Sequence, residues 1–265
     1  LLTSTTYVGT TRDMLVEPLG RRGLRVGVDI SVAFSPERID PGNAQFHHTD
    51  VPRVVGGVTP ACSERAIALL RRGGLPLHQV SSPEAAELTK LYENTFRAVN
   101  IALANEMADI SSSLGVEVTE VIDAAATKPY GFMAFQPGPG VGGHCIPCDP
   151  HYLLWQLREQ RLQMPVVESA MRGIAARPSQ VVARCRELLA ERGAPIRGAT
   201  IAIVGVAYKP GVEDVRESPA LEIIERLRRL GAKVGFVDEL ASSIRMADGS
   251  TMTSWSPDSD LARTL

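Results

Sequence analysis

"TIAIVGVAYKPGVEDVRESPALEIIERLRRLGAKVGFVD", residues 200–238, is the stretch that decides the fold. Two short apolar runs, 200–208 and 232–238, have the length of buried strands, and the stretch 219–231 between them has helical spacing and ends on a glycine. A strand, a helix and a strand in this order predict a βαβ unit with parallel strands. We therefore expect an α/β protein with a Rossmann-like parallel sheet in this region.

The loop after the first of these strands carries two basic residues, Lys209 and Arg216. Its first turn, GVAYKPG, lacks the G-x-G-x-x-G spacing of a dinucleotide site, yet phosphates bind at the carboxyl ends of parallel strands. The two side chains either face a phosphate or are solvated surface charges, and the residues alone leave both possibilities open. Asp238, at the end of the second strand, is expected to be a turn residue.

Residues 1–80 alternate turns with short apolar runs. The runs at 24–36 and 52–58 are strand-like, and the pattern over 10–23 predicts a helix that ends at its terminal glycine.

From about residue 81 the pattern becomes helical. Ser81 and Glu84 predict a capping box, and the helix should run to Gly115, which makes it about 30 residues and about 45 Å long. Such a length suggests a helix that bridges domains or forms a dimer. A further boundary falls at the glycine-rich stretch 192–199, so the expected regions are 1–80, 81–194 and 195–265.

The composition is that of an ordinary globular protein: 265 residues, 44% hydrophobic, 22% charged, with a formal net charge of −2. Two short basic pairs give no electrostatic footprint for nucleic acid. No apolar run approaches the roughly 20 residues that span a bilayer. The four cysteines are too sparse for a disulfide scaffold, which favours a reducing cytoplasm.

Both ends of the chain fall inside expected elements. Residues 1–11 begin like the tail of a buried strand, and residues 258–265 begin like a helix. We therefore expect this sequence to be part of a longer protein.

"GPGVGGHCIPCDPH", residues 138–151, places two cysteines and two histidines in eight positions. Four ligands this close leave little room to close a tetrahedral metal site around two prolines, so no metal is expected. A C-x-x-C redox pair would normally follow a strand and open a helix, whereas a Gly-Pro run precedes this one. A single nucleophilic cysteine is the favoured interpretation.

The surrounding residues support a nucleophile at Cys145. Gly140, Gly142 and Gly143 would let the backbone approach a ligand closely. Asp149 followed by a proline predicts the N-cap and first residue of a helix, and a thiolate near a helix N-terminus is favoured by the helix dipole. The other three cysteines are expected to be small core residues.

The long helix carries a polar stripe in which Lys90 and Asn94 lie one turn apart, flanked by Glu87 and Arg97. Apolar residues cover most of the other sides, so the helix is expected to be largely buried and the stripe to face water, a partner or a site. The alternative is a solvated face on which Glu87 pairs with Lys90.

Six consecutive blocks resemble the nucleotide-sugar 6-dehydrogenases of the UDP-glucose/GDP-mannose dehydrogenase family. They are STTYVGTT, FSPERIDPGN, PRVVGGVTP, SSPEAAELTKLYENTFRAVNIALANEMADI, GPGVGGHCIPCDP and GVAYKPGVEDVRESPALEIIERL. Residues 124–145 are most similar to the branch that acts on UDP-N-acetylhexosamines, UDP-N-acetylglucosamine first, with UDP-N-acetylmannosamine or UDP-glucose as alternatives. The resemblance implies parts of two Rossmann-like domains, for NAD and for UDP, joined by a central helical domain that forms a homodimer.

The resemblance also implies an activity: oxidation of a sugar C6 alcohol to the acid with two NAD⁺, for surface polysaccharide precursors. Carried over by position, it assigns the thioester nucleophile to Cys145, oxyanion stabilisation to Lys90 and Asn94, and a held water to Asp149 with Thr5. It implies that Glu37 assists thioester hydrolysis. It also implies that the cofactor is contacted by Thr5, Glu37 and Arg216. The implied substrate contacts are Arg38, Gly142, Tyr208 and Lys209.

Some positions depart from the family pattern. Val8 stands where the family usually has proline. Cys148 stands where an aliphatic residue is common, which implies that its side chain packs. Ile174 falls about where the family frequently has asparagine. The first half of the NAD domain, with its glycine-rich turn, is absent from these residues. A catalytically inactive remnant that serves as a dimerising scaffold, and a zinc or redox module on HCIPC, are the rival hypotheses.

Overall fold

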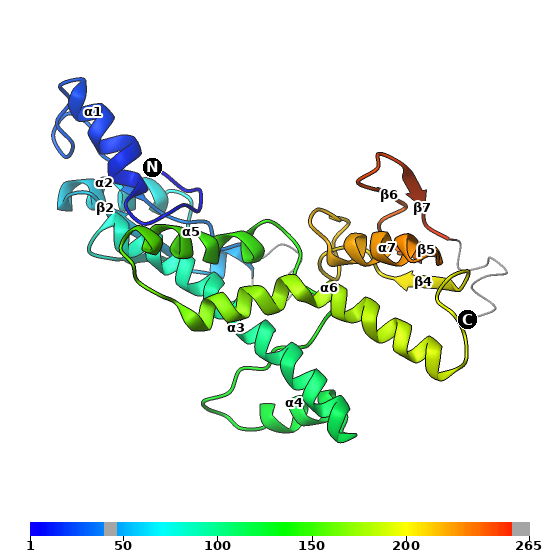
Figure 1. Cartoon of the computed structure of the whole chain (residues 1–265). Coiled ribbons are helices and arrows are strands. Elements are labelled where there is room, and N and C mark those ends of the chain that lie inside the picture. The colour runs from blue at the N-terminus through cyan, green and yellow to red at the C-terminus, as the bar shows by residue number, and fades with distance from the viewer. Residues whose placement is uncertain (40–46, 256–265) are drawn as a thin grey trace. The chain divides into compact units, whose positions relative to one another are not determined.

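The computed structural model describes residues 1–39 and 47–255. The chain divides into two compact units, each described here by itself: Leu1–Arg97 with Cys148–Pro165, and Ala98–Pro147 with Val166–Leu265. Helices α3 (Pro83–Leu114) and α5 (Cys145–Glu159) contribute residues to both units (Figure 1). Each unit has a pair of parallel strands, and the α/β class is confirmed.

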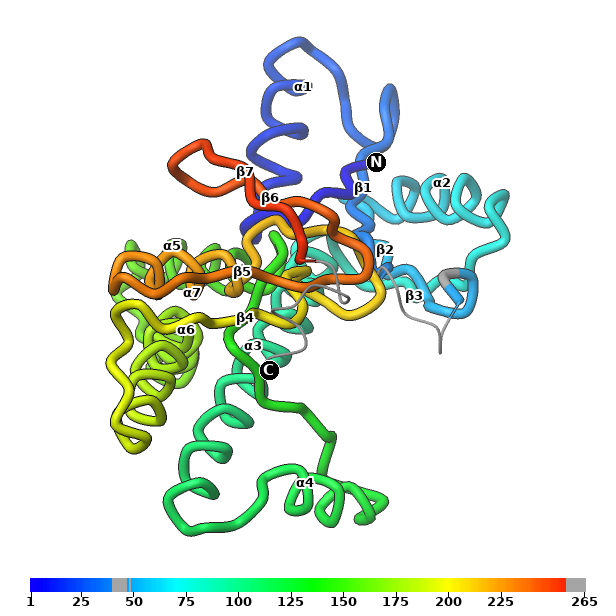
Figure 2. Tube along the Cα trace, turned by 90° about the vertical axis from the view of Figure 1, so that its right-hand side faces the viewer, coloured from blue at the N-terminus to red at the C-terminus, as the bar shows by residue number. Residues whose placement is uncertain are grey.

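The first unit is built on a three-stranded sheet in the order β1 (Ala33–Phe34), β2 (Arg53–Gly57) and β3 (Leu77–Gln79). Strand β2 runs antiparallel to β1 and parallel to β3. Because successive side chains alternate between faces, Ala33 and Val55 pack with Ala66 of helix α2 (Pro60–Arg71), beside the sheet in Figure 2. Phe34 and Val54 pack on the opposite side with Ala86 of α3. The shorter elements are η1 (Arg12–Val16), α1 (Glu17–Arg21) and η2 (His48–Asp50).

Two glycines in β2 let both helices close on the sheet. A Cβ on Gly56 would lie 2.0 Å from the carbonyl oxygen of Ser82, at the start of α3, and a Cβ on Gly57 would lie 2.3 Å from the backbone nitrogen of Ser63 in α2. Neither position has room for a side chain. The run of 52–58 contains strand β2, as predicted, and its two glycines allow α3 and α2 to approach the sheet closely.

The strand expected over 24–36 is largely wrong. Only β1 is extended there, because Gly27 has φ +91° and residues 25–30 form a hydrogen-bonded turn. Helix α2 was not predicted, although Thr59 caps it by accepting from the Cys62 N–H and Pro60 occupies its first turn. The helix predicted over 10–23 is present as η1 and α1, and Gly23 follows it at φ +80°.

The second unit contains the predicted βαβ unit: β4 (Thr200–Val204), α7 (Pro219–Arg229) and β5 (Lys233–Val237), with β4 and β5 parallel. Figure 1 shows α7 beside these strands, where Ile224 packs with Phe236. The unit also contains α4 (Val118–Ala126), α6 (Pro165–Glu191) and the antiparallel pair β6 (Ser243–Arg245) and β7 (Thr251–Thr253), a hairpin that was not predicted. The helix start expected at 258–265 and residues 40–43 of the FSPERIDPGN block lie outside the described residues.

Helix α3 has 32 residues and ends at Leu114, as the sequence predicts, but one of its sides is exposed. Its exposed apolar side chains recur at helical spacing along one stripe: Leu88, Tyr92, Phe96, Leu103, Met107, Ile110 and Leu114. The expectation of a largely buried helix is therefore wrong along this stripe.

The N-cap of α3 is Ser82, not Ser81. Ser82 Oγ accepts from the Ala85 N–H at 3.2 Å, while Glu84 pairs with Arg12 at 2.5 Å and so does not complete the predicted capping box. An N-cap serine satisfies a backbone donor that the helix itself leaves unpaired.

Replacing the true cap should destabilise the fold selectively. We expect Ser82→Ala to lower the free energy of unfolding by about 1 kcal/mol, because an N–H of the first turn loses its acceptor. Ser81→Ala, the matched control, should change it by less than about 0.5 kcal/mol. Urea unfolding followed by circular dichroism measures both, and an equal loss in the two variants would return the cap to Ser81.

Candidate active site

Helices α3 and α5 meet in the first unit through a buried polar contact. Asn94 on α3 is 8% exposed and Asp149 on α5 is 4% exposed, and the Asn94 amide Nδ2 donates to the Asp149 carboxylate. Lys90, half-buried one turn before Asn94, acts on the same carboxylate through its charge. The structure thus brings together three of the residues that the sequence predicted for a site.

The pKa of Asp149 is raised above its ordinary value. Burial is the largest cause, because it disfavours the charged form. The hydrogen bond from Asn94 and the positive charge of Lys90 pull the pKa back down without cancelling the effect of burial. A carboxyl group in this state holds its proton to higher pH than an exposed aspartate does, which suits proton transfer.

Helix α5 begins at Cys145, so Asp149 is not the N-cap that the sequence predicted. Asp149 is the fifth helical residue, and Pro150 is the sixth. Pro150 lies inside the helix and offers no N–H to the carbonyl one turn before it. The expectation that Cys145 lies at a helix N-terminus is confirmed, since it is the first residue of α5.

The other cysteines divide into two groups. Cys62 is buried, as expected of a core residue, and Cys185 is half-buried with its pKa raised by burial. Cys148 is exposed, so the prediction that it packs in the core is wrong. The early start of α5 is the reason, because the helix turns Asp149 and Leu153 inward and leaves Cys148 on the outer face.

Glu87 binds the loop that follows Thr5 and does not belong to a solvated face. Its side chain is buried, and its two carboxylate oxygens accept from the Gly9 N–H at 2.6 Å, the Thr11 N–H at 2.8 Å and the Thr11 hydroxyl at 2.6 Å. The alternative in which Glu87 forms an exposed pair with Lys90 is therefore wrong. Hydrogen bonds to a carboxylate are stronger than neutral ones, so this contact fixes the loop to α3.

Helix α5 holds the same loop from another side. The Gln156 side chain accepts from the Val8 N–H at 3.1 Å and donates to the Val8 carbonyl at 2.6 Å. A proline at this position, which the resemblance leads one to expect, could not donate the first of these bonds. The departure at Val8 thus comes with a partner of its own. Thr5, half-buried, lies in the segment that these bonds position.

The two predicted site residues after β1 are already paired. The exposed Glu37 accepts from the N–H groups of Arg38 and Ile39 and lies 3.4 Å from Arg53. Arg38 bonds Glu93 of α3 at 2.6 Å. A substrate or cofactor group would therefore meet charges that are oriented by the protein.

In the second unit, the glycines before Cys145 approach protein, whereas the sequence predicted that they approach a ligand. A Cβ on Gly142 would lie 2.6 Å from Tyr208 Cβ, and one on Gly143, at φ +78°, would lie 3.2 Å from the Tyr208 ring. A Cβ on Gly140 would lie 2.8 Å from Pro219. These close approaches seat the loop before Cys145 on the loop after β4, which carries Tyr208 and the half-buried Lys209.

Arg216 is bound within its own loop. Its guanidinium donates hydrogen bonds to both oxygens of the Asp214 carboxylate. These bonds to Arg216 lower the pKa of Asp214 to about 2. Asp238 accepts backbone N–H groups from four residues; burial opposes its ionisation, but these bonds leave its pKa lowered. The prediction that Asp238 is a turn residue is confirmed.

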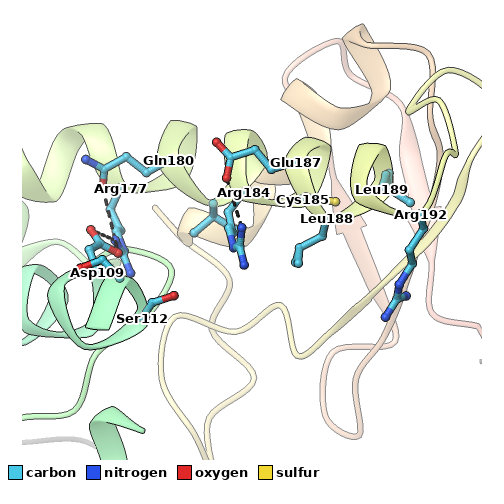
Figure 3. Close-up of a pocket in the computed structure, with 12 residues that line it drawn as sticks. Asp109, Ser112, Arg177, Gln180, Arg184, Cys185, Glu187, Leu188, Leu189 and Arg192 are labelled. Carbon is cyan, nitrogen blue, oxygen red and sulfur yellow. Dashed lines mark hydrogen bonds and ion pairs between the residues drawn. The ribbon is translucent and has the colours of Figure 1, made fainter. Parts of the chain in front are cut away.

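A groove of about 760 Å³ in the second unit lies between the end of α3 and α6 (Figure 3). Two of its arginines are paired with acidic residues: Arg177 bonds both carboxylate oxygens of Asp109 at 2.7 Å, and Arg184 lies near Glu187 and Glu191. Arg177 also donates to the Gly138 carbonyl, while Asn105 accepts from the Gly138 N–H. The groove is lined by none of the predicted site residues, and its contacts anchor the start of the glycine loop.

Within residues 1–39 and 47–255, no group of three or more histidine, cysteine or acidic side chains is placed to hold a metal ion. Over the same residues, no helix has both the length and the apolar character needed to cross a bilayer.

Sequence reasoning missed the residues that position others. Glu87, Glu93 and Gln156 bind partners 55 to 148 positions away in the chain, so no local pattern identifies those partners. One signal was available for Glu87: it is an acidic residue three positions before Lys90 on a helix that is otherwise rich in apolar residues.

Comparisons with known proteins identify three domains of one family along the chain. Residues 1–72, 84–173 and 202–262 match the NAD-binding, central and UDP-binding domains of the UDP-glucose/GDP-mannose dehydrogenase family. With an α/β fold and all three domain matches in order along its length, the chain belongs to the UDP-glucose/GDP-mannose dehydrogenase family.

Relatives with curated names include UDP-N-acetyl-D-mannosamine dehydrogenase of Salmonella typhi, 36% identical over 86% of this chain and 56% of the relative. UDP-N-acetyl-D-glucosamine 6-dehydrogenase of Pseudomonas aeruginosa is 33% identical over 91% of this chain and 57% of the relative. The solved structure of the UDP-D-ManNAc dehydrogenase of Pyrococcus horikoshii superposes with a TM-score of 0.82 at 36% identity, covering 91% of this chain and 57% of that one. The chain spans about half the length of the curated relatives it matches.

The raised pKa of Asp149 predicts a pH-dependent stability. A carboxyl whose folded pKa lies above its unfolded value stabilises the fold below the unfolded pKa and loses that contribution as the pH rises through the folded pKa. Asp149→Asn keeps an acceptor for Asn94 and removes the buried charge. We therefore expect its melting temperature, relative to the unsubstituted chain, to rise between acidic and neutral pH.

Thermal unfolding from pH 4 to pH 8 measures this difference. Asp13→Asn, a change at an exposed carboxylate of the same unit, is the control and should not reproduce this rise. A relative melting temperature of Asp149→Asn that falls with rising pH would contradict the raised pKa.

Proposed function

We propose that the protein oxidises the C6 hydroxyl of a UDP-N-acetylhexosamine to the carboxylate with NAD⁺, through a thioester on Cys145. The observation that carries the proposal is the buried contact of Asn94 with Asp149 beside Lys90. A buried amide, a carboxyl with a raised pKa and an ammonium form a cluster whose parts suit charge stabilisation and proton transfer.

The cluster supplies what the oxidation needs from the protein. Removing hydride from the C6 alkoxide, and later from a thiohemiacetal, builds negative charge on oxygen in each step. Lys90 brings a positive charge and Asn94 a second amide N–H beyond the one that it donates to Asp149. Asp149, with Thr5, would hold the water that hydrolyses the thioester and take its proton.

The covalent steps conserve atoms and charge. The Cys145 thiolate adds to the aldehyde carbon, and the resulting thiohemiacetal loses a second hydride to give the thioester. Water then breaks the carbon–sulfur bond and returns the thiol, with Glu37 assisting. Overall one alcohol, one water and two NAD⁺ give one carboxylate, two NADH and three protons. When bound, NAD⁺ accepts the hydride in each oxidation.

The edge of the first sheet fits a nicotinamide cofactor. Leu2 and Phe34 form a parallel bridge, so the segments that follow them leave the sheet at one edge. Thr5 and Glu37 each come three residues after these bridge partners. Cofactors bind at the carboxyl edge of such parallel strands. We assign Thr5 and Glu37, with Arg216, to the cofactor.

The substrate is assigned by chemistry and by likeness. Tyr208, Lys209, Gly142 and Arg38 are proposed contacts of the sugar nucleotide, and residues 202–262 match a UDP-binding domain. Relatives named for UDP-N-acetylmannosamine and UDP-N-acetylglucosamine support an N-acetylated sugar. UDP-N-acetylglucosamine is the first candidate, with the mannosamine epimer and UDP-glucose as alternatives.

An activity assay tests the proposal in a form of the protein as long as its relatives. We expect two NADH per uronic acid with UDP-N-acetylglucosamine. Cys145→Ser should lower kcat by about 10⁴-fold or more, because it removes the nucleophile. Cys148→Ser, the matched control on the same helical turn, should stay near the original rate.

Parallel assays with UDP-N-acetylmannosamine and UDP-glucose decide the sugar. Equal loss in both cysteine variants would contradict a single nucleophile. Absence of NADH formation with all three sugars would favour the inactive scaffold instead.

We also propose that the exposed apolar stripe of α3 forms a homodimer. The stripe recurs at helical spacing from Leu88 to Leu114, and its Tyr92 is 69% exposed. Sedimentation of the chain should show a dimer, and Tyr92→Asp should shift it toward monomer. Glu106→Ala, an exposed polar position on the same helix, is the control, and a monomer without any substitution would overturn the proposal.

A further inference from the structure

Two thiols share the first turn of helix α5. Cys145 is the first residue of the helix and Cys148 the fourth, and both are exposed. Pro147 between them is at a position where the helix needs no backbone donor, because the first four N–H groups of a helix have no intrahelical acceptor. The structure thereby removes one reason against a redox pair, since the C-x-x-C segment opens a helix after all.

The spacing permits a bond between the two sulfurs. Residues three apart in an α-helix have Cα atoms about 5 Å apart, from a rise of 1.5 Å per residue and a radius of 2.3 Å. Disulfides are found at Cα separations of about 4.4–6.8 Å. Their Cβ atoms must come closer than the usual 5–6 Å of an (i, i+3) pair, roughly to 4 Å, so the first turn has to tighten. A strained, exposed disulfide of this kind is easily reduced.

We propose that Cys145 and Cys148 form a reversible dithiol–disulfide site that takes small thiol–disulfide partners such as glutathione disulfide. The Cys145 thiolate attacks one sulfur of the oxidant, forming a mixed disulfide and releasing one thiolate. The Cys148 thiolate then attacks the Cys145 sulfur, closing the intramolecular disulfide and releasing the second. The protein loses two protons and two electrons, and one glutathione disulfide becomes two glutathione molecules.

The order of attack follows from the helix. Cys145, at the N-terminus, lies where the partial positive charge of the helix favours a thiolate, and Cys148 lies one turn further in. The two remaining cysteines differ in access: Cys62 is buried, and burial raises the pKa of the half-buried Cys185. Oxidation should therefore be confined to the α5 pair.

The consequence for the proposed function is a switch. The thioester chemistry needs the Cys145 thiolate, and the disulfide occupies that sulfur, so the oxidised protein would be unable to form the covalent intermediate. Reduction by a thiol restores it. The disulfide itself is a property of helix α5 and exists whether or not the dehydrogenase assignment holds.

Mass spectrometry of the purified, reduced chain after incubation with glutathione disulfide tests the site directly. We expect a product lighter by two hydrogens whose peptide map joins residues 145 and 148, and its loss on adding reduced glutathione. In Cys148→Ser the reaction should stop at a glutathione adduct on Cys145, because the resolving thiol is missing. Cys185→Ser, the control, should oxidise like the unsubstituted chain.

Two results would overturn the proposal. One is an unsubstituted chain that accumulates the glutathione adduct without the lighter product. The other is a lighter product that persists in Cys148→Ser, which would place the bridge elsewhere. Circular dichroism of each variant establishes that it is folded. Neither result depends on turnover, so failure here leaves the dehydrogenase assignment untouched, and a failed activity assay leaves the disulfide untouched.

Discussion

The hydrogen bond from Asn94 to Asp149 joins two helices through side chains that are almost entirely withdrawn from water. Burying a carboxylate is costly unless it is paired and hydrogen-bonded, and here one amide and one nearby ammonium supply the compensation. Burial still dominates, since the pKa of Asp149 stays raised. A fold selected only for stability would place an apolar residue at this position. A carboxyl group at this buried position, where its charged form is disfavoured, is consistent with a role in proton transfer.

The same two helices also position the loop that carries Thr5. Glu87 of α3 binds Gly9 and Thr11, and Gln156 of α5 binds both backbone groups of Val8. The loop is therefore fixed by the elements that hold Asn94 and Asp149, so a displacement of either helix would move both. At the start of α3, Gly56 of β2 leaves room for the Ser82 carbonyl, so the helix begins in close contact with the sheet.

Local patterns predicted the elements, and long-range contacts decided the details. The βαβ unit over 200–238 and the 32-residue α3 were predictable, because the hydrophobic periodicity and the terminal glycine that define each of them lie within its own segment. The N-terminus of α5 was not, since an Asp-Pro pair usually marks a helix start and here it lies inside one. The role of Glu87 could not be predicted from the sequence either, because its partner Thr11 is 76 positions away. Exposure was misjudged for Cys148 and for the apolar stripe of α3, since burial depends on what packs against a helix.

Burial, opposed by Asn94 and Lys90, sets the proton affinity of Asp149. Carbon-detected NMR titration of the Asp149 carboxyl measures that affinity directly, in the unsubstituted chain and in Lys90→Met. We expect a pKa above that of an exposed aspartate in the first and a still higher one in the second, because the substitution removes a charge that lowers it. A pKa at or below the ordinary value, or one that Lys90→Met leaves unchanged, would contradict it.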